Sequence, residues 1–220
     1  LQNLELGKND GRARIVREVF DGGYNYMRSG QQLRKIINKL EDIDFNSLKE
    51  RQHFGDIYEK ILSDLQSAGN SGEFYTPRAV TQFMADRIDP KPGEILIDPA
   101  CGTGGFLTCA INHMRKHHVK GVKQERLLQS SLRGVEKKHM PHLLCMTNLL
   151  LHDIEDPGFV RHDNTLARPY TSWTKDERVD IVLTNPPFGG KETDGIESNF
   201  PKAYQTRETA DLFLALILRL

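Results

Sequence analysis

The apolar positions of this chain change their spacing near residue 70. Before that point they recur three and four residues apart, as on the buried face of an α-helix. The helical stripes occupy residues 15–20, 33–40 and 54–65. The segment 67–73, SAGNSGE, is small, polar and glycine-bearing, which is typical of a joint. We therefore predict an all-α amino-terminal module at residues 1–68 and a second domain at residues 69–220.

In the second domain, short apolar runs alternate with helical stripes. Thr76 and Pro77 are expected to be the N-cap and the first residue of a helix. Strands are predicted at residues 94–98, 132–136, 159–164 and 179–184, with helices around 106–114, 140–151 and 210–220. This alternation predicts an α/β fold, a Rossmann-like doubly wound, mostly parallel sheet. Such sheets usually have more strands, so we expect the sheet to be incomplete at its carboxyl end.

The charge of the chain limits how it can hold nucleic acid. Thirty basic residues balance thirty acidic ones, whereas a protein that binds DNA without a partner usually has an excess of basic residues. Any duplex substrate is therefore expected to need a partner protein. The densest basic run, residues 114–126, follows a predicted helix, and we favour a solvated helix end over a phosphate contact for it. No apolar run is long enough to span a membrane and no signal peptide is evident, so we expect a cytoplasmic protein.

The cysteines and histidines do not form a recognisable metal or nucleophile pattern. Cys101, Cys109 and Cys145 lack ligand spacing, so reduced, partly buried thiols are expected. Cys101 is expected to be a small packing residue because no base is placed near it. His113 and His117 are one helical turn apart, but with no third ligand in the pattern we expect a solvated face and no metal site.

A glycine-rich turn follows the first predicted strand, where open parallel sheets bind ligands. In DPACGTGGF, residues 98–106, the glycines allow close approach of a ligand, and Asp98 is held extended before a proline. A carboxylate disfavours a pyrophosphate and favours a ligand with an ammonium or sulfonium group. We therefore predict an S-adenosylmethionine site that includes Asp98, Gly102, Thr103 and Gly104.

The next two strand ends carry further polar side chains. Glu136 ends the second strand, where a carboxylate can accept hydrogen bonds from both hydroxyls of a ribose. Asp163 or Asn164 follows the third strand, within reach of an adenine amino group. An Asx turn without a ligand is the alternative for Asp163 and Asn164.

The fourth strand runs into Asn185, Pro186, Pro187 and Phe188. Asn185 precedes a proline and is confined to extended backbone, while the two prolines fix their own φ angles and supply carbonyl acceptors. The oxygens of Asn185 and Pro186 can grip both hydrogens of an aromatic amine, which favours a pyramidal, nucleophilic nitrogen. Phe188 is expected to stack on the ring that carries the amine. A turn that merely ends the strand is the alternative.

Taken in order, these segments resemble the modification subunit of type I restriction-modification systems, within the N6-adenine DNA methyltransferase family. They are GEFYTPRAV (72–80), DPACGTGGFL (98–107), GVEK (134–137), MTNLLLH (146–152), DNTL (163–166) and NPPFGG (185–190). The resemblance implies that a segment closes over the methionine end of the cofactor, with contacts from Glu73, Phe74, Tyr75, Thr76, Pro77 and Arg78. It also implies methylation of a flipped adenine in duplex DNA by two modification subunits and one specificity subunit, with which a restriction subunit can associate.

Other functions fit parts of the same pattern. The Asn-Pro-Pro-aromatic segment also suits the planar amide nitrogen of a glutamine, so a protein glutamine methyltransferase is one alternative. A scaffold subunit that keeps the fold without catalysis is another. A dehydrogenase is disfavoured because the phosphate-binding GxGxxG pattern is absent from the sequence.

Overall fold

The computed structural model describes residues 29–42, 47, 54, 55, 57, 58, 60, 62 and 76–220. From residue 76 onward, helices and strands alternate as the sequence predicts. The elements are α4 (Arg78–Ile88), β1 (Leu96–Asp98), α5 (Gly105–His117), α6 (Val122–Ser131), β2 (Leu132–Glu136), α7 (His139–Leu151), β3 (Val160–His162), β4 (Ile181–Val182) and α8 (Thr209–Ile217). Short 3-10 turns fill much of the sequence between β3 and α8. None of the helices in the described ranges is long and apolar enough to cross a membrane.

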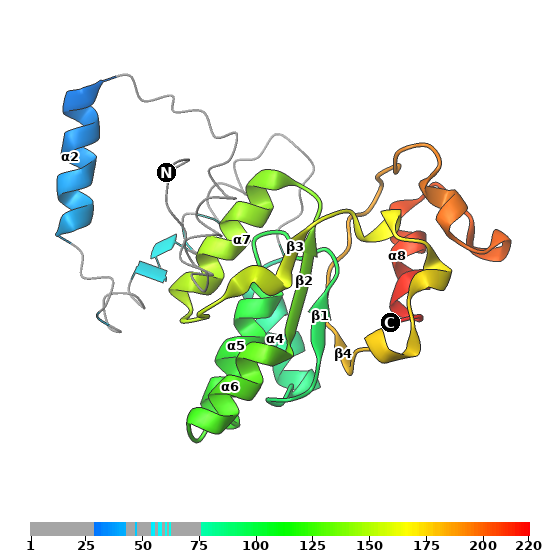
Figure 1. Cartoon of the computed structure of the whole chain (residues 1–220), viewed down its shortest axis with the longest axis horizontal. Coiled ribbons are helices and arrows are strands. Elements are labelled where there is room, and N and C mark those ends of the chain that lie inside the picture. The colour runs from blue at the N-terminus through cyan, green and yellow to red at the C-terminus, as the bar shows by residue number, and fades with distance from the viewer. Residues whose placement is uncertain are drawn as a thin grey trace, which may run out of the picture.

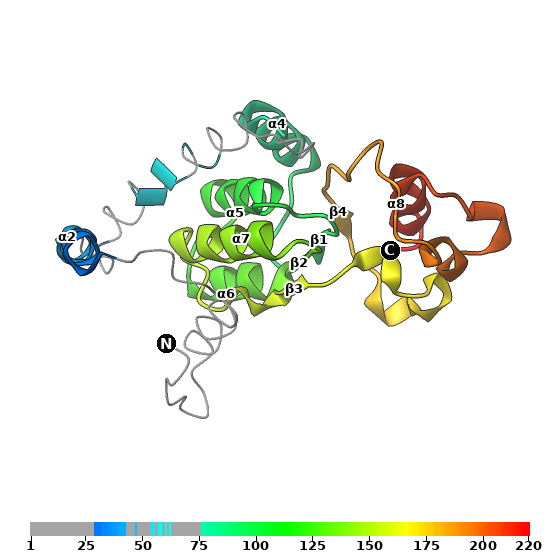
Figure 2. The same cartoon turned by 90° about the horizontal axis from the view of Figure 1, so that it is seen from above.

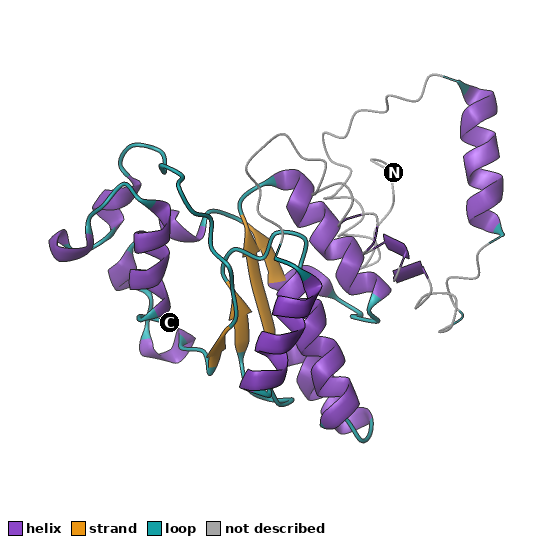
Figure 3. Ribbon diagram, turned by 180° about the vertical axis from the view of Figure 1, so that it is seen from behind, coloured by secondary structure: helices purple, strands orange, loops and turns teal. Residues whose placement is uncertain are grey.

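The four predicted strands form one parallel sheet in the order β3-β2-β1-β4 (Figures 1 and 3). The chain moves outward from β1 to β2 and β3, then returns to place β4 on the other side of β1. The strand order therefore reverses between β1 and β4, and open α/β sheets bind ligands at such a switch point, beyond the carboxyl ends of the strands. The α/β prediction and its parallel sheet are confirmed.

Helices cover both faces of the sheet, as a doubly wound fold requires. Figure 2 shows α4, α5, α6 and α7 on one side and α8 on the other. On the first side, Leu107 and Ile111 of α5 and Leu149 of α7 are fully buried with the β-strand side chains Leu96 and Leu132. On the second side, four side chains of α8 pack against three from the preceding segments and form a separate apolar cluster. The α8 residues are Leu212, Phe213, Ala215 and Leu216, and the others are Leu166, Trp173 and Phe200. Residues 210–217 are helical, as predicted, but α8 is not buried between layers, because Leu214 and Leu218 are exposed.

The amino-terminal part is helical where it is described. α2 (Gly30–Glu41) corresponds to the predicted stripe at 33–40, although Leu33, Ile36 and Ile37 are exposed. Residues 54, 55, 57, 58, 60 and 62 are also helical. Tyr58 donates its hydroxyl to the Leu144 carbonyl of α7 at 3.3 Å, so this region contacts the second domain. The joint at 67–73 lies outside the described residues, and the boundary at 68/69 stays a prediction.

The basic run 114–126 differs from its predicted form. It spans the end of α5, a turn and the beginning of α6, a helix that the sequence analysis did not identify. Lys116, Lys120 and Lys123 are exposed, as expected for a solvated surface. Arg115 is not: its guanidinium donates to the Glu125 carboxylate on α6 and to the His152 carbonyl at the end of α7. This arginine ties three helices together.

The solvated face predicted for His113 is wrong. Only 6% of the His113 side chain is exposed, because the carboxyl ends of α4 and α5 pack against each other there. Its two ring nitrogens face Asp86 and Asp89 of the α4 end. His117, one turn further along α5, is exposed as predicted.

Candidate functional site

Two adjoining hollows lie at the switch point of the sheet. The larger has a volume of roughly 330 Å³, within the usual range for small-molecule sites. The smaller has a volume of roughly 70 Å³ and contains Asp98 at the end of β1. Asn185, which follows β4, lines both hollows, together with Ala100, Gly102 and Thr103. The strand ends thus bring the glycine turn and the Asn-Pro-Pro segment to one place, as the sequence predicts.

Asp98 supplies a buried acidic group in the smaller hollow. Only 1% of the residue is exposed, and its Oδ1 accepts a hydrogen bond from the Ala100 backbone N–H at 3.1 Å. Burial raises the pKa of this carboxyl to about 7, and the nearby Glu136 carboxylate adds to the increase. A cation bound in the hollow would compensate the cost of burying the ionised form. Asp98 is therefore suited to an ammonium or sulfonium group.

The glycine turn is hydrogen-bonded to β2 and α7. The Cys101 N–H donates to the Val135 carbonyl at 3.0 Å, and Asn148 of α7 donates its amide to the Thr103 carbonyl at 3.1 Å. Gly104 has φ +84°, and a Cβ there would lie 2.8 Å from the Cys145 Sγ. Only glycine fits this position. Gly104 does not line either hollow. It allows the turn conformation in which Gly102 and Thr103 line both hollows.

Cys101 and Cys145 pack beside this turn as free, buried thiols. The Cys145 thiol and burial both raise the pKa of Cys101 well above its ordinary value. A thiol that resists ionisation is a poor nucleophile. Cys101 belongs to the core cluster, in agreement with the predicted packing role, and it also lines the smaller hollow.

Glu136 connects the glycine turn to the next element. Its carboxylate accepts the Gly102 N–H at 2.9 Å through one oxygen and the Lys138 N–H at 2.7 Å through the other. The side chain also lines the larger hollow. Because each carboxylate oxygen can accept more than one hydrogen bond, Glu136 can hold the turn and still accept from two hydroxyls of a ligand.

Asp163 and Asn164 also line the larger hollow, next to Glu136. The Asp163 N–H donates to the Glu136 carbonyl at 3.0 Å, which sets the two strand ends side by side. Asn164 caps a 3-10 turn by accepting the Leu166 N–H at 3.1 Å and donates its amide to Glu192 at 3.1 Å. The Asx-turn alternative therefore describes Asn164, and the Asp163 Oδ1 accepts the Asn164 N–H at 2.7 Å. An adenine contact from Asp163 stays a prediction.

Asn185 is fixed by a residue from the other end of the domain. Its Nδ2 donates to the Thr76 hydroxyl at 3.0 Å, which leaves the amide oxygen for other donors. Pro186 and Pro187 line the larger hollow beside it. Phe188 does not: it is 58% exposed and lies outside both linings. A stacking role for Phe188 stays a prediction.

The amino-terminal motif is only partly described. Glu73, Phe74 and Tyr75 lie outside the described residues. Thr76 lines the smaller hollow, but it does not cap α4 as predicted, because Pro77 occupies the N-cap position and the Thr76 hydroxyl meets Asn185. Pro77 and Arg78 lie outside both linings, and Arg78 donates to the Thr108 hydroxyl of α5 at 2.9 Å.

The sequence analysis missed several residues of the larger hollow. Lys137, Lys138 and Lys191 add positive charge to the lining, and Glu192 accepts from the Lys137 ammonium at 2.8 Å. Phe213 of α8 supplies an aromatic wall. The lysines directly follow Glu136 and Gly190, so proximity to the two motifs is the signal that could have identified them.

The arrangement combines three chemical features. A buried carboxylate lies in the smaller hollow, the polar side chains of Glu136, Asp163 and Asn164 line the larger one, and Asn185 lines both. It suits a nucleoside with a cationic substituent, placed so that the substituent faces an amine held by Asn185.

Comparison with known proteins gives a consistent result. The family described as N-6 DNA methylase matches residues 49–219. The methylase subunit of the type I restriction enzyme EcoEI of Escherichia coli is 62% identical over 220 residues, which cover 99% of this chain and 44% of that protein. The modification subunit of a putative type I restriction enzyme from Vibrio vulnificus YJ016 superposes with a TM-score of 0.86 at 46% identity, over 100% of this chain and 45% of that one.

A structure solved to explain complex assembly and conformational transition of a type I R-M system is also similar. It has a TM-score of 0.84 at 36% identity and covers 97% of this chain and 43% of that one. This chain thus spans less than half the length of these relatives. The resemblance drawn from the ordered motifs is confirmed.

Proposed function

Because this chain belongs to the N-6 DNA methylase family, we propose that it carries the catalytic site of a type I modification subunit. The reaction is transfer of a methyl group from S-adenosylmethionine to the exocyclic N6 of an adenine that is flipped out of duplex DNA. The observation that carries the proposal is that Asn185 lines both the hollow with Asp98 and the hollow with Glu136. The methyl donor and the acceptor amine can therefore meet at Asn185.

The two hollows divide the binding of the cofactor. Glu136 is placed to accept from the ribose hydroxyls, and Asp163 from the adenine amino group of the cofactor. Asp98 is placed to balance the positive charge of the methionine part. When bound, the cofactor supplies an electrophilic methyl group on a sulfonium sulfur. The carboxylates of this chain bind and orient it, and none of them needs to act as a strong base.

Asn185 and Pro186 act on the acceptor. The Asn185 oxygen and the Pro186 carbonyl accept the two N6 hydrogens, which directs the nitrogen lone pair toward the methyl carbon. These two acceptors would stabilise the positive charge that develops on N6 during methyl transfer. The Thr76 hydroxyl holds Asn185 in place from the other side. After transfer, the proton that N6 loses would pass to solvent water, because the cationic nitrogen is acidic.

The proposal includes the other subunits of the complex. With equal numbers of acidic and basic residues, the chain has no overall charge to attract DNA. We assign sequence reading to a specificity subunit, in a complex with a second copy of the modification subunit and with a restriction subunit as an optional partner. A cytoplasmic location, where such a complex meets DNA, belongs to the same proposal.

The test is methyl transfer with the assembled complex. The full protein would be co-purified with its specificity subunit, incubated with labelled S-adenosylmethionine and duplex DNA, and the modified bases mapped. The proposal predicts N6-methyladenine at one recurring sequence. Label on a glutamine of a protein would support the alternative enzyme, and failure of calorimetry to detect cofactor binding would support a non-catalytic scaffold. Either result would contradict the proposal.

A further inference from the structure

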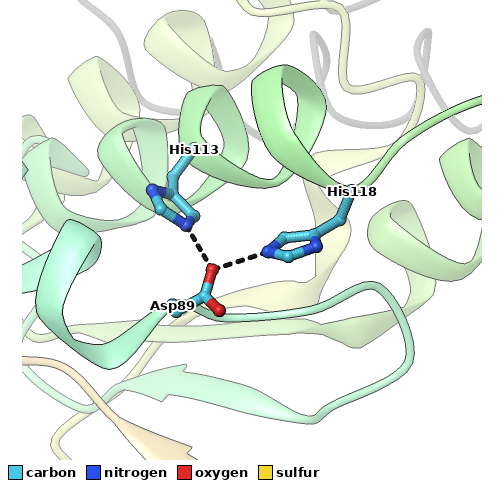
Figure 4. Close-up of side chains that lie close together, drawn as sticks. All are labelled: Asp89, His113 and His118. Carbon is cyan, nitrogen blue, oxygen red and sulfur yellow. Dashed lines mark hydrogen bonds and ion pairs between the residues drawn. The ribbon is translucent and has the colours of Figure 1, made fainter.

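A second group of polar side chains lies at the carboxyl ends of α4 and α5 (Figure 4). Asp89 directly follows α4, His113 lies in the last turns of α5, and His118 directly follows α5. The Asp89 Oδ1 is 2.8 Å from the His113 Nε2 and 2.6 Å from the His118 Nε2. One ligand atom from each residue lies within 4.8 Å of the others. The two helices begin near the cofactor hollow, so this cluster lies at their opposite ends.

Both ring nitrogens of His113 face carboxylates. Its Nδ1 faces the Asp86 Oδ1 at 2.8 Å, and its Nε2 faces the Asp89 Oδ1 at the same distance. A neutral imidazole has one N–H and can donate to only one carboxylate. The other nitrogen would direct its lone pair at a carboxylate oxygen. A metal ion between Nε2 and Asp89 would accommodate both contacts.

We propose that Asp89, His113 and His118 bind a divalent transition-metal ion of the zinc class. Two imidazoles and one carboxylate form a common ligand set for zinc, with a water in the fourth position. Zinc bonds of about 2.0–2.1 Å in a tetrahedral site place the ligand atoms about 3.3 Å apart, so the two distances to Asp89 would each lengthen by about 0.5–0.7 Å. The Asp89 side chain is 47% exposed, which gives water access to the fourth position.

Asp86 completes the site as a positioning residue. Metal-binding histidines usually donate their second ring N–H to a carboxylate, which fixes the tautomer and the ring orientation. The Asp86 carboxylate does this for the Nδ1 of His113. The Nε2 of His113 is then deprotonated and directed at Asp89. The exposed His117, on the same helix, has its ring 4.7 Å from that of His113 but is not part of the ligand set.

The backbone of Asp89 has a left-handed conformation at the end of α4. Its φ is +53° and its ψ is +56°, in a region where aspartate is enriched among non-glycine residues. Here it ends α4 and turns the carboxylate toward α5. A bound ion would thus clamp the ends of α4 and α5 together, far from the methyl-transfer chemistry, and its role would be structural.

Metal binding tests the proposal directly. The full protein without a histidine tag would be stripped with a chelator, then titrated with Zn²⁺ by calorimetry and with Co²⁺ by visible absorption. The proposal predicts one ion per chain, tetrahedral Co²⁺ bands and a melting temperature that rises by several degrees with Zn²⁺. Less than half an ion per chain, with no change in melting temperature, would show that the cluster is held by hydrogen bonds alone and would overturn the proposal.

Variants identify the ligands. His118→Ala and Asp89→Ala are chosen because both residues are partly exposed, so they are less disruptive than a change at the buried His113. Each is expected to weaken Zn²⁺ binding at least tenfold and to abolish the rise in melting temperature. Asp86→Asn is expected to weaken binding about 10- to 100-fold. His117→Ala is the matched control and should bind as the unchanged protein does. Unchanged binding in His118→Ala and Asp89→Ala would place the ion elsewhere and overturn the assignment.

Discussion

The side-chain amide of Asn185 donates a hydrogen bond of 3.0 Å to the hydroxyl of Thr76, which is 109 residues earlier in the chain. Asn185 follows β4, and Thr76 lies just before α4. The contact therefore connects the Asn-Pro-Pro segment, which we propose binds the acceptor amine, to the start of α4. It also sets the orientation of the amide, because with Nδ2 bound to Thr76 the oxygen is free to face a substrate.

Loss of the Thr76 hydroxyl should therefore reduce turnover. Thr76→Val keeps the shape but removes the acceptor of the Asn185 amide. Since one hydrogen bond contributes about 0.5–1.5 kcal/mol net, we expect kcat to decrease roughly 3- to 10-fold at saturating cofactor. Thr76→Ser keeps the hydroxyl and should restore most of the rate. Equal rates for the valine and serine variants would show that the contact does not position Asn185.

The pKa of Asp98 predicts a pH dependence of cofactor affinity. The carboxyl has a pKa of about 7 in the structure without cofactor, and a cation favours its ionised form. Binding should thus release a proton below pH 7, and the affinity should rise about tenfold from pH 6 to pH 8. Calorimetry in buffers of different ionisation enthalpy measures both quantities. Asp98→Asn should bind more weakly with a flatter pH profile, and an unchanged slope in this variant would assign the titration to another group.

Glu136 should contribute strongly to cofactor affinity. Its carboxylate accepts the Gly102 and Lys138 N–H groups and is placed to accept from the ribose. Because hydrogen bonds to charged groups contribute about 1.5–3 kcal/mol, Glu136→Ala should weaken S-adenosylmethionine binding roughly 10- to 100-fold. Glu136→Gln keeps one acceptor oxygen and should be intermediate. Glu197, which lies outside the hollow, provides the control Glu197→Ala, and an effect there as large as at Glu136 would contradict the assignment.

Gly104 should be intolerant of any side chain. In Gly104→Ala the Cβ would lie 2.8 Å from the Cys145 Sγ, at a φ of +84°. The backbone strain and the overpacking together should lower the free energy of unfolding by about 2–4 kcal/mol, measured by chemical denaturation. Gly93→Ala is the control, because Gly93 also has a positive φ but no atom within 4 Å of the added Cβ. The two variants should differ by more than about 1 kcal/mol, and equal losses would show that contact with Cys145 is unimportant.

The strands and the main site were predictable because both depend on local sequence patterns. The second strand has the predicted bounds 132–136, and the other three lie within their predicted segments. Strands of a parallel sheet are buried on both faces and appear as short apolar runs. Their polar ends, Asp98, Glu136 and Asn185, meet at one edge because the sheet is parallel.

The features that were not predicted depend on tertiary contacts. α6 was missed because only Leu128 and Ser131 are buried along it, which leaves no clear apolar stripe. Nothing in the spacing of His113 points to Asp89, 24 residues away, because the two meet only where α4 packs against α5. Thr76 has the sequence signature of an N-cap, but its hydroxyl is used by Asn185.

The central claim is that the Asn185 amide stabilises the transition state of methyl transfer, and the single-turnover rate of Asn185→Ala tests it most directly. By analogy with loss of one oxyanion-hole donor, about 3 kcal/mol should be lost, so the rate at saturating cofactor and DNA should decrease about a hundredfold or more. Cofactor affinity should stay within about threefold, and Asn199→Ala, at an asparagine that binds the Leu166 and Ala167 carbonyls outside the hollow, should react normally. A rate for Asn185→Ala equal to that of the unchanged protein would contradict the account.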